Sequence, residues 1–177
     1  WSAVAPMGSK RYCHAAVVLP VPRVLVMGGF DGSSFLNTAE LYDPQTKTWG
    51  AAPPMGSKRW GPAAVVLPGP RVLVMGGSDG SSALNTAELY DPQSQTWSAV
   101  APMGSKRWGP AAVVLPGPRV LVMGGSDGSS SPNNAELYDP QSQSRSAVAP
   151  MGSKDSSHAA MLVAGCVVLR PFGPDDS

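Results

Sequence analysis

The sequence repeats itself with a period of 48 residues, and this periodicity restricts the chain to folds built from tandem copies of one small unit. Trp1, Trp49 and Trp97 mark the starts of three copies, and Arg145 takes the place of a fourth tryptophan. The second and third copies differ at seven of 48 positions, so they are expected to share one local structure. A fourth copy begins at Arg145 and loses the pattern before Ser177.

Each copy has the pattern of four short strands separated by turn residues, and no segment has the pattern of a helix. In the middle copy, residues 63–67 form a continuous apolar run, which is typical of a strand covered on both faces. Residues 71–75 form a second run that ends at two glycines, and residues 85–90 alternate polar and apolar side chains. The last strand, 96–103, contains Pro102, which is tolerated only at a strand end or an edge. The sequence therefore predicts an all-β fold with this last strand outermost.

The composition supports a folded domain and limits its partners. With 42% hydrophobic residues, a chain of 177 residues can form a core. The 13 basic and 12 acidic residues leave a net charge of +1, which gives no general attraction to nucleic acid or to an anionic membrane. No apolar run reaches the roughly 18 residues that a membrane-spanning helix needs. We therefore expect neither nucleic acid nor a membrane as a partner.

The residues at the strand ends resemble those of the kelch repeat. In that pattern a double glycine closes the second strand, a tyrosine stands near the end of the third, and a tryptophan opens the fourth. The chain has these residues at Gly28-Gly29, Tyr42 and Trp49, at Gly76-Gly77, Tyr90 and Trp97, and at Gly124-Gly125 and Tyr138. The resemblance, which covers residues 1 to about 165, implies a kelch-type β-propeller of four-stranded antiparallel blades.

The repeat boundaries predict a single domain over residues 1–177, with three complete blades and a partial fourth. The expected units are an orphan last strand at 1–7, blades at 8–55, 56–103 and 104–151, and a partial blade at 152–177. Three arrangements remain open. The chain could form a four-bladed ring in which residues 1–7 pair with strands within 157–170, it could exchange the orphan strand with a second chain in a dimer, or it could be a fragment of a larger propeller.

Two loops of each blade should emerge on one face, because successive strands run antiparallel. They are the loop before the first strand and the loop after the second strand. In BTB-kelch adaptors, which the chain resembles, arginines of the first loop and serines of the second bind acidic peptides. The matching positions are Arg11, Arg59, Arg107, Ser33, Ser34, Ser81, Ser82, Ser129 and Ser130. The first loops also contain Lys10, Lys58, Lys106, Tyr12, Trp60 and Trp108.

The resemblance therefore predicts a protein-interaction scaffold that recognises a peptide, acidic or phosphorylated, at this face. Guanidinium groups suit this role because each can hold a carboxylate or a phosphate through two hydrogen bonds. The alternative is that each arginine only braces its loop. Asp31, Asp79 and Asp127 are expected to form turns, because each precedes a glycine.

An enzymatic function has less support, although a carbohydrate-directed or redox enzyme on the same fold remains the alternative. No nucleotide-binding, hydrolase or metalloprotease motif occurs. Glu40, Glu88 and Glu136 recur in identical contexts, so we interpret them as structural. His14 and His158 have no clustered partners, and we expect no metal or cofactor. A recent duplication without any selected partner is a further possibility.

The two cysteines are predicted to be free thiols. Cys13 begins a first strand on the face that carries the two loops, whereas Cys166 begins a second strand at the opposite end of the propeller, too far away for a disulfide. Free thiols suit a reducing compartment, and we expect a cytoplasmic protein.

Overall fold

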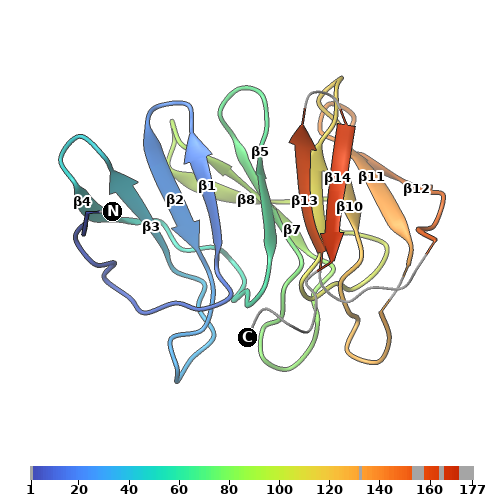
Figure 1. The fold of residues 1–177 in the computed structure, drawn as a ribbon, viewed down its shortest axis with the longest axis horizontal. Helices are drawn as coiled ribbons and strands as arrows, with labels where there is room; N and C mark the ends of the chain where they lie inside the picture. Colours follow the sequence, from blue (N-terminus) through green and yellow to red (C-terminus); the bar gives the residue numbers. More distant parts are fainter. Residues whose placement is uncertain (1, 132, 153–157, 164–165, 172–177) are drawn as a thin grey trace.

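The structure is a computed structural model that describes residues 2–131, 133–152, 158–163 and 166–171. It contains three four-stranded antiparallel sheets and a two-stranded hairpin (Figure 1), which confirms the predicted all-β fold of propeller blades. The first sheet holds β1 (Ala15–Leu19), β2 (Arg23–Met27), β3 (Ala39–Asp43) and β4 (Thr48–Ala52). The second holds β5 (Ala63–Val66), β6 (Val72–Met75), β7 (Ala87–Asp91) and β8 (Thr96–Val100). The third holds β9 (Ala111–Val114), β10 (Val120–Met123), β11 (Ala135–Asp139) and β12 (Ser144–Val148), and the hairpin holds β13 (His158–Val163) and β14 (Cys166–Pro171).

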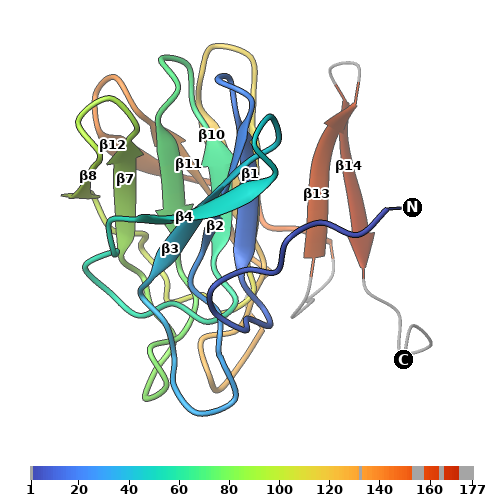
Figure 2. The same cartoon turned by 90° about the vertical axis from the view of Figure 1, so that its left-hand side faces the viewer.

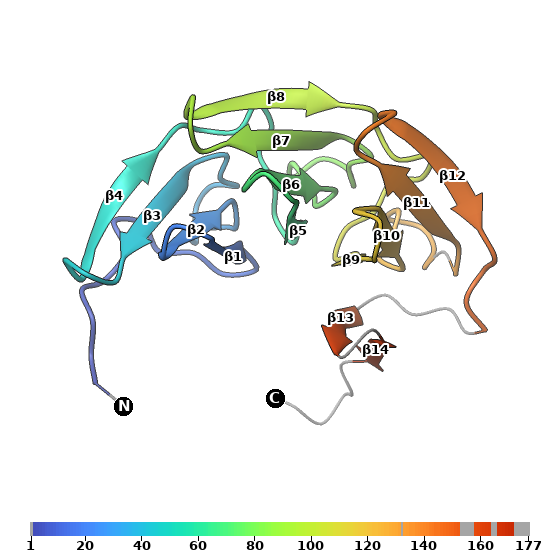
Figure 3. The same ribbon diagram turned by 90° about the horizontal axis from the view of Figure 1, so that it is seen from above.

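The sheets stand side by side in an arc, with the first strand of each sheet on the inside (Figure 3). β1 contacts β5, β5 contacts β9, and β9 contacts β13, so the inner strands form a continuous row. β4, β8 and β12 form the outer edges, as predicted from the proline that follows each of them. Across the described residues, no helix has the length and apolar character needed to cross a membrane.

The apolar core lies between neighbouring sheets. Leu25 and Met27 of β2 belong to one cluster with Val72 and Val74 of β6, and all four side chains are fully buried. Every residue of β6 is buried, because a sheet on each side covers both of its faces. Burial of a side chain of this size contributes about 1.5–3 kcal/mol, so contacts between blades carry much of the stability.

The double glycine at the end of β2 allows the second blade to approach the first. Gly28 and Gly29 have φ angles of 68° and 92°, in a region that favours glycine. A Cβ atom on Gly28 would collide with the backbone carbonyl oxygen of Arg59 in the next blade. The same oxygen accepts a hydrogen bond from Gly29 N–H at 2.8 Å. Close contact between blades therefore requires the glycine pair that characterises the repeat.

The predicted strand at residues 1–7 is wrong for residues 2–7, which the structure describes without any strand. The last strand of a blade pairs with the third strand of the same blade, and among the described residues no third strand lies beside this segment. Trp49 Nε1 instead donates a hydrogen bond to the Ala5 carbonyl oxygen, at 2.8 Å. Among the described residues the four-bladed ring is not closed, because the sheets make an open arc (Figure 3). Exchange of residues 1–7 between two chains stays a prediction.

Candidate functional site

The loop face is the surface formed by two sets of loops. Those before the first strand of each blade span 8–14, 56–62 and 104–110, and those after the second strand span 30–36, 78–84 and 126–131. The two loops of each blade pair with each other, through the β-bridges Tyr12–Phe30, Trp60–Ser78 and Trp108–Ser126. Figures 1 and 2 show these loops together at the lower edge of the molecule. The prediction that they share one face is therefore confirmed.

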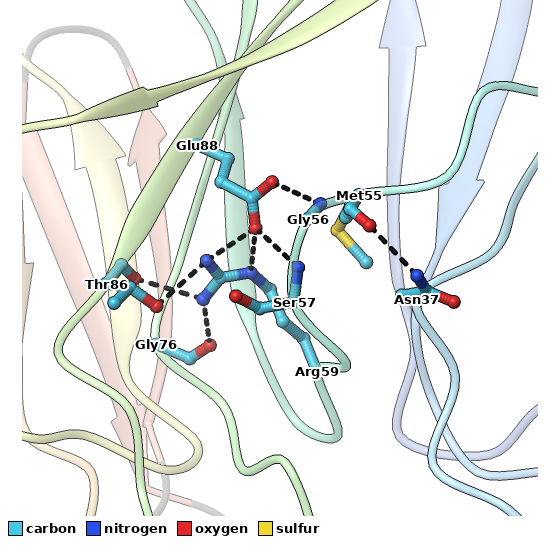
Figure 4. Close-up of polar contacts among 8 residues, drawn as sticks. All are labelled: Asn37, Met55, Gly56, Ser57, Arg59, Gly76, Thr86 and Glu88. Carbon is cyan, nitrogen blue, oxygen red and sulfur yellow. Dashed lines mark hydrogen bonds and ion pairs between the residues drawn. The ribbon is translucent and has the colours of Figure 1, made fainter.

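The arginine expected at the rim of the loop face lies inside its blade. The Arg59 side chain is 0% exposed and donates five hydrogen bonds (Figure 4). Two reach Glu88 Oε1, at 3.2 and 2.8 Å. Two reach the carbonyl oxygens of Gly76 and Thr86, at 2.8 and 3.0 Å, and the fifth reaches the Thr86 hydroxyl. A guanidinium group whose donors are all engaged in this way is not available to a ligand.

The same ion pair recurs in the other two blades. Arg11 pairs with Glu40 at 2.9 Å and Arg107 with Glu136 at 3.0 Å, and both arginine side chains are 0% exposed. The prediction that Arg11, Arg59 and Arg107 present their charge to a peptide is therefore wrong. In each blade, backbone carbonyls and a buried carboxylate accept the hydrogen bonds of the guanidinium group, although Arg107 Nε has no partner among the described residues. The alternative interpretation, in which the arginine braces its loop, agrees with these contacts.

The glutamates complete the brace, as expected of structural residues. Glu88 Oε2 accepts a hydrogen bond from Gly56 N–H at 2.6 Å, and Oε1 accepts one from Ser57 N–H at 3.2 Å (Figure 4). Each loop before a first strand is thus tied to the third strand of its own blade. A further hydrogen bond holds the segment that leads into the second blade, where Asn37 Nδ2 donates to the Met55 carbonyl oxygen at 3.0 Å.

The buried contacts shift the pKa values of Glu40 in the first blade and Arg59 in the second. Burial raises the pKa of Glu40, but hydrogen bonds from the Arg11 guanidinium and from Gly8 N–H outweigh it, and the pKa lies below its ordinary value of 4.5. Burial lowers the pKa of the Arg59 guanidinium, while Glu88 opposes the change. The Glu40 carboxyl is therefore ionised at neutral pH, where it lies 2.9 Å from the Arg11 guanidinium.

The serine loops are organised by the aspartate that opens each Asp-Gly turn. Asp79 Oδ1 accepts hydrogen bonds from the Ser81 hydroxyl at 2.7 Å and from Ser81 N–H and Ser82 N–H at 2.8 and 2.9 Å. These hydrogen bonds lower the pKa of Asp79 to about 2, and the bond from the Ser81 hydroxyl makes the largest contribution. Asp31 and Asp127 make equivalent turns. Their predicted role as turn formers is confirmed.

The other predicted site residues lie at the surface of the loop face. The three lysines and all six serines are exposed. The hydroxyls of Ser81, Ser129 and Ser130 donate to the aspartate of their own loop. Because the three predicted arginines are buried, the exposed positive charges among the predicted site residues belong to Lys10, Lys58 and Lys106.

A row of aromatic side chains crosses the loop face. The ring centroid of Tyr12 lies 5.3 Å from that of Phe30 and 6.2 Å from that of Trp60. Phe35 lies 4.8 Å from Phe30 and 5.8 Å from Trp60, and Trp60 lies 4.8 Å from Trp108. These distances suit edge-to-face and tilted aromatic contacts. We call Tyr12, Phe30, Phe35, Trp60 and Trp108 the aromatic row, and it joins loops of all three blades.

The structure adds two residues to the site that sequence reasoning missed. Phe30 and Phe35 were not among the predicted site residues, although they differ from the serine and the alanine at the same positions of the second copy. Such a departure inside an otherwise unchanged loop is the signal that could have found them. Among the described residues, no three side chains of His, Cys, Asp or Glu are grouped as a metal site would require. Cys13 is an exposed free thiol, as predicted.

Two larger hollows lie at the outer strands and reach the first residues of loops 8–14 and 56–62. They have volumes of about 710 and 640 Å³ and lie beside Trp97 and Trp49. Their charged lining residues, such as Arg59 and Glu88, already bind each other. The exposed lysines, serines and aromatic rings converge instead on the loop face, which we therefore take as the candidate site.

Comparisons with known proteins agree with the blade architecture. A family model described as "KLHDC2/KLHL20/DRC7 Kelch-repeats domain" matches residues 1–171. No curated protein matches the chain, whereas 168 chains of solved structures do. One of them, described as "Structure of YjhT", has a TM-score of 0.83 and 16% sequence identity over 96% of this chain. The match covers 61% of that protein, so the chain spans less than two thirds of its length.

Proposed function

Because the chain belongs to the kelch-repeat family, we propose that it serves as a protein-interaction module that binds a peptide segment of its partner at the loop face. The observation that carries this proposal is the aromatic row, which joins the loops of three blades. Aromatic side chains are enriched in protein interfaces, because they bury a large apolar area and lose little side-chain entropy. Tyr12, at 52% exposed, can lose much more surface on binding.

The proposed affinity comes mainly from aromatic contact rather than from an arginine ring. The buried ion pairs remove three cations from the face, and Asp79, with its pKa of about 2, adds a negative charge to the same face. Lys10, Lys58 and Lys106 supply the remaining positive charge. Exposed charges of this kind contribute little, so a preference for acidic or phosphorylated peptides is expected to be small.

We propose a binding role without catalysis. Glu88 and its two counterparts, which a glycosidase-like mechanism would need as free acids, are each held by an arginine and two backbone N–H groups. The proposal also places the protein in the cytoplasm, where a reducing environment would preserve the exposed thiol of Cys13.

Peptide selection tests the proposed function. A displayed library of random peptides is panned on the intact chain, and the affinity of enriched peptides is measured for the wild type and for a Tyr12→Ala/Trp60→Ala double variant. Loss of two aromatic contacts should weaken binding by about tenfold or more. The control is Val21→Ser, in the exposed turn between β1 and β2 at the other end of the blade. Equal binding to the double variant, or an equal loss in the control, would contradict the proposal.

A further inference from the structure

We propose that a pocket between the second and third blades on the loop face receives an aromatic side chain of the bound partner. The inference rests on the proposed function and names the group that this face recognises. The pocket has a volume of about 230 Å³ and is walled by Trp60 and Trp108, with Ala83 and Gly128 among its lining residues. A cavity of about 150 Å³ already accommodates benzene, so a phenyl or phenol ring fits.

The first blade shows which group belongs in such a place. Phe35 reaches from the first blade toward the second and lies 5.8 Å from Trp60, centroid to centroid. Its ring covers Gly80 so closely that a Cβ atom on that glycine would overlap it. The chain therefore fills the space between its first and second blades with its own aromatic ring.

The equivalent space between the second and third blades lacks this ring. One repeat further along, Phe35 becomes Ala83, Trp60 becomes Trp108, and Gly80 becomes Gly128. Apart from Gly128 itself and its two chain neighbours, no residue of the described structure has an atom within 4 Å of the position that a Cβ on Gly128 would occupy. The pocket is thus the site of the missing phenylalanine ring, with the tryptophan and glycine walls still in place.

The backbone around the two positions is the same, so the comparison is direct. Phe35 bridges to Phe30, and Ala83 bridges to Ser78 in the same antiparallel manner. Leu36 N–H donates to the Gly29 carbonyl at 2.9 Å, and Leu84 N–H donates to the Gly77 carbonyl at 2.8 Å. Only the side chains differ. An aromatic ring supplied by a partner can therefore occupy the place that Phe35 occupies in the first blade.

The chemistry of the walls favours an aromatic ring over an aliphatic chain. Stacking on an indole stabilises an aromatic ring beyond the burial of apolar area, and a glycine floor allows a flat ring to approach the backbone. Ser78 stands at the position of Phe30, and with Ser81, Ser82 and Ser126 it gives the pocket a polar edge that can accept the hydroxyl of a tyrosine.

The test uses the intact chain and N-acetyl-tyrosinamide as the probe, with N-acetyl-leucinamide as the aliphatic comparison. Binding is followed by NMR at the Trp108 indole N–H and the Gly128 amide. We expect saturable shifts with the tyrosine probe and a Kd at least about tenfold weaker for the leucine probe. Ala83→Phe should fill the pocket as Phe35 fills its own, and should abolish the shifts without lowering the melting temperature.

The matched variant is Phe35→Ala, which should open a second pocket between the first and second blades. The tyrosine probe should then also shift the amide of Phe30, which does not line the existing pocket, and should keep its binding at Gly128. This variant keeps the proposal testable if Ala83→Phe fails to fold. Absence of shifts at Trp108, equal binding of the leucine probe, or no new site in Phe35→Ala would overturn the inference.

The same variants separate this inference from the proposed function. Loop-face peptides that bind Ala83→Phe as tightly as the wild type would leave the peptide-binding role standing and refute the aromatic pocket. Selection of no loop-face peptide, together with intact binding of the tyrosine probe, would refute the peptide-binding role and leave the pocket.

Discussion

The Arg59 guanidinium exchanges water for five hydrogen bonds within its blade, and its carboxylate partner is only 8% exposed. At the scale of single residues, such a buried pair is costly to break, because the group left behind keeps its charge without a partner. The pair therefore specifies where the loop lies against the third strand. This structural role contrasts with the surface role that the resemblance implied for the arginine.

Arg59→Met is expected to destabilise the protein by about 3–5 kcal/mol, because Glu88 would stay buried without its cation. Urea unfolding measures the change. Lys58→Met is the matched control, because Lys58 is next to Arg59 in the chain and its side chain is exposed. Loss of the Lys58 ammonium group should change the free energy of unfolding by less than about 0.5 kcal/mol. Similar small effects of both substitutions would show that the ion pair does not hold the loop.

Cys13 occupies a conformation that the other copies assign to glycine. Its φ angle is 51°, and the equivalent Gly61 and Gly109 both have 64°. A left-handed conformation costs a residue with a Cβ atom roughly 1–2 kcal/mol, partly offset by the larger unfolded-state entropy of glycine. Cys13→Gly should therefore raise the free energy of unfolding by about 0.5–1 kcal/mol. Cys13→Ala, which keeps a Cβ, should give no gain; a gain of the same size there would exclude backbone strain as the cause.

The lowered pKa values of Glu40 and Asp79 predict that acid destabilises the fold. A carboxyl whose pKa is lower in the folded state than in the unfolded state stabilises the protein above its unfolded pKa, and this stabilisation is lost as the pH falls. For Asp79 the range runs from its ordinary value of 3.8 down to about 2. The urea midpoint should drop across this range and drop less in Asp79→Asn, whose amide oxygen can still accept the loop N–H bonds. An equal drop in both proteins would exclude a contribution from Asp79.

At the scale of elements, the hydrophobic pattern predicted four strands per copy, and the structure has four. The strand ends differ from the predicted ones where backbone polar groups bind residues far away in the sequence. The third strand was expected from Asn85 but begins at Ala87. The Asn85 carbonyl instead accepts a hydrogen bond from Met103 N–H at 2.7 Å, and the Thr86 carbonyl accepts one from Arg59 Nη1 at 3.0 Å. These partners lie 18 and 27 residues away, beyond the reach of a local pattern.

The candidate site was predictable in part. The antiparallel order of the strands is sufficient to place the two sets of loops on one face. The lysines, serines and aromatic residues within these loops could therefore be assigned to that face from the sequence. The burial of Arg59 depends on a contact with Glu88, 29 residues away, which strand patterns do not reveal. The constant spacing of an arginine and a glutamate in three copies was the available signal.

In the third blade, Arg145 stands where the last strand of the other blades has a tryptophan. Arg145 reproduces the hydrogen bond and the ring contact of that tryptophan but leaves two buried donor nitrogens without partners among the described residues. Arg145 Nε donates to the Ala101 carbonyl at 2.8 Å, as Trp97 Nε1 does to Pro53, and its guanidinium lies 4.5 Å above the Tyr138 ring. Its other two nitrogens are buried and have no hydrogen-bond partner within the described part of the chain. Burial also lowers the pKa of this guanidinium.

Arg145→Trp should therefore stabilise the third blade by about 1–3 kcal/mol, because it removes two unsatisfied buried donors and keeps the hydrogen bond and the ring contact. Thermal unfolding and urea unfolding both measure the gain. The reciprocal control is Trp97→Arg in the second blade, which should lose a comparable amount. Destabilisation by both substitutions would indicate that the third blade has adapted to the arginine.

At the scale of the whole molecule, the stability of each blade depends on its place in the arc. The second blade has a sheet on each side, whereas in the described structure the first blade has one on a single side (Figure 3). The same residue type therefore meets different surroundings at equivalent positions. Val18 of β1 is 69% exposed, while Val66 of β5 packs against the core cluster between the first two blades.

The pair Val18→Ala and Val66→Ala tests whether contacts between blades stabilise the fold. Removing methyl groups that are already in water should change the free energy of unfolding by less than about 0.5 kcal/mol, whereas removing those packed between sheets should cost about 1 kcal/mol or more. Because the two substitutions are chemically identical and lie at the same strand position, strand propensity cancels in the comparison. Equal losses measured in urea would mean that Val18 is covered in solution, by a further blade or by a second chain. Equal small changes would mean that contacts between blades contribute less than the burial of Val66 implies.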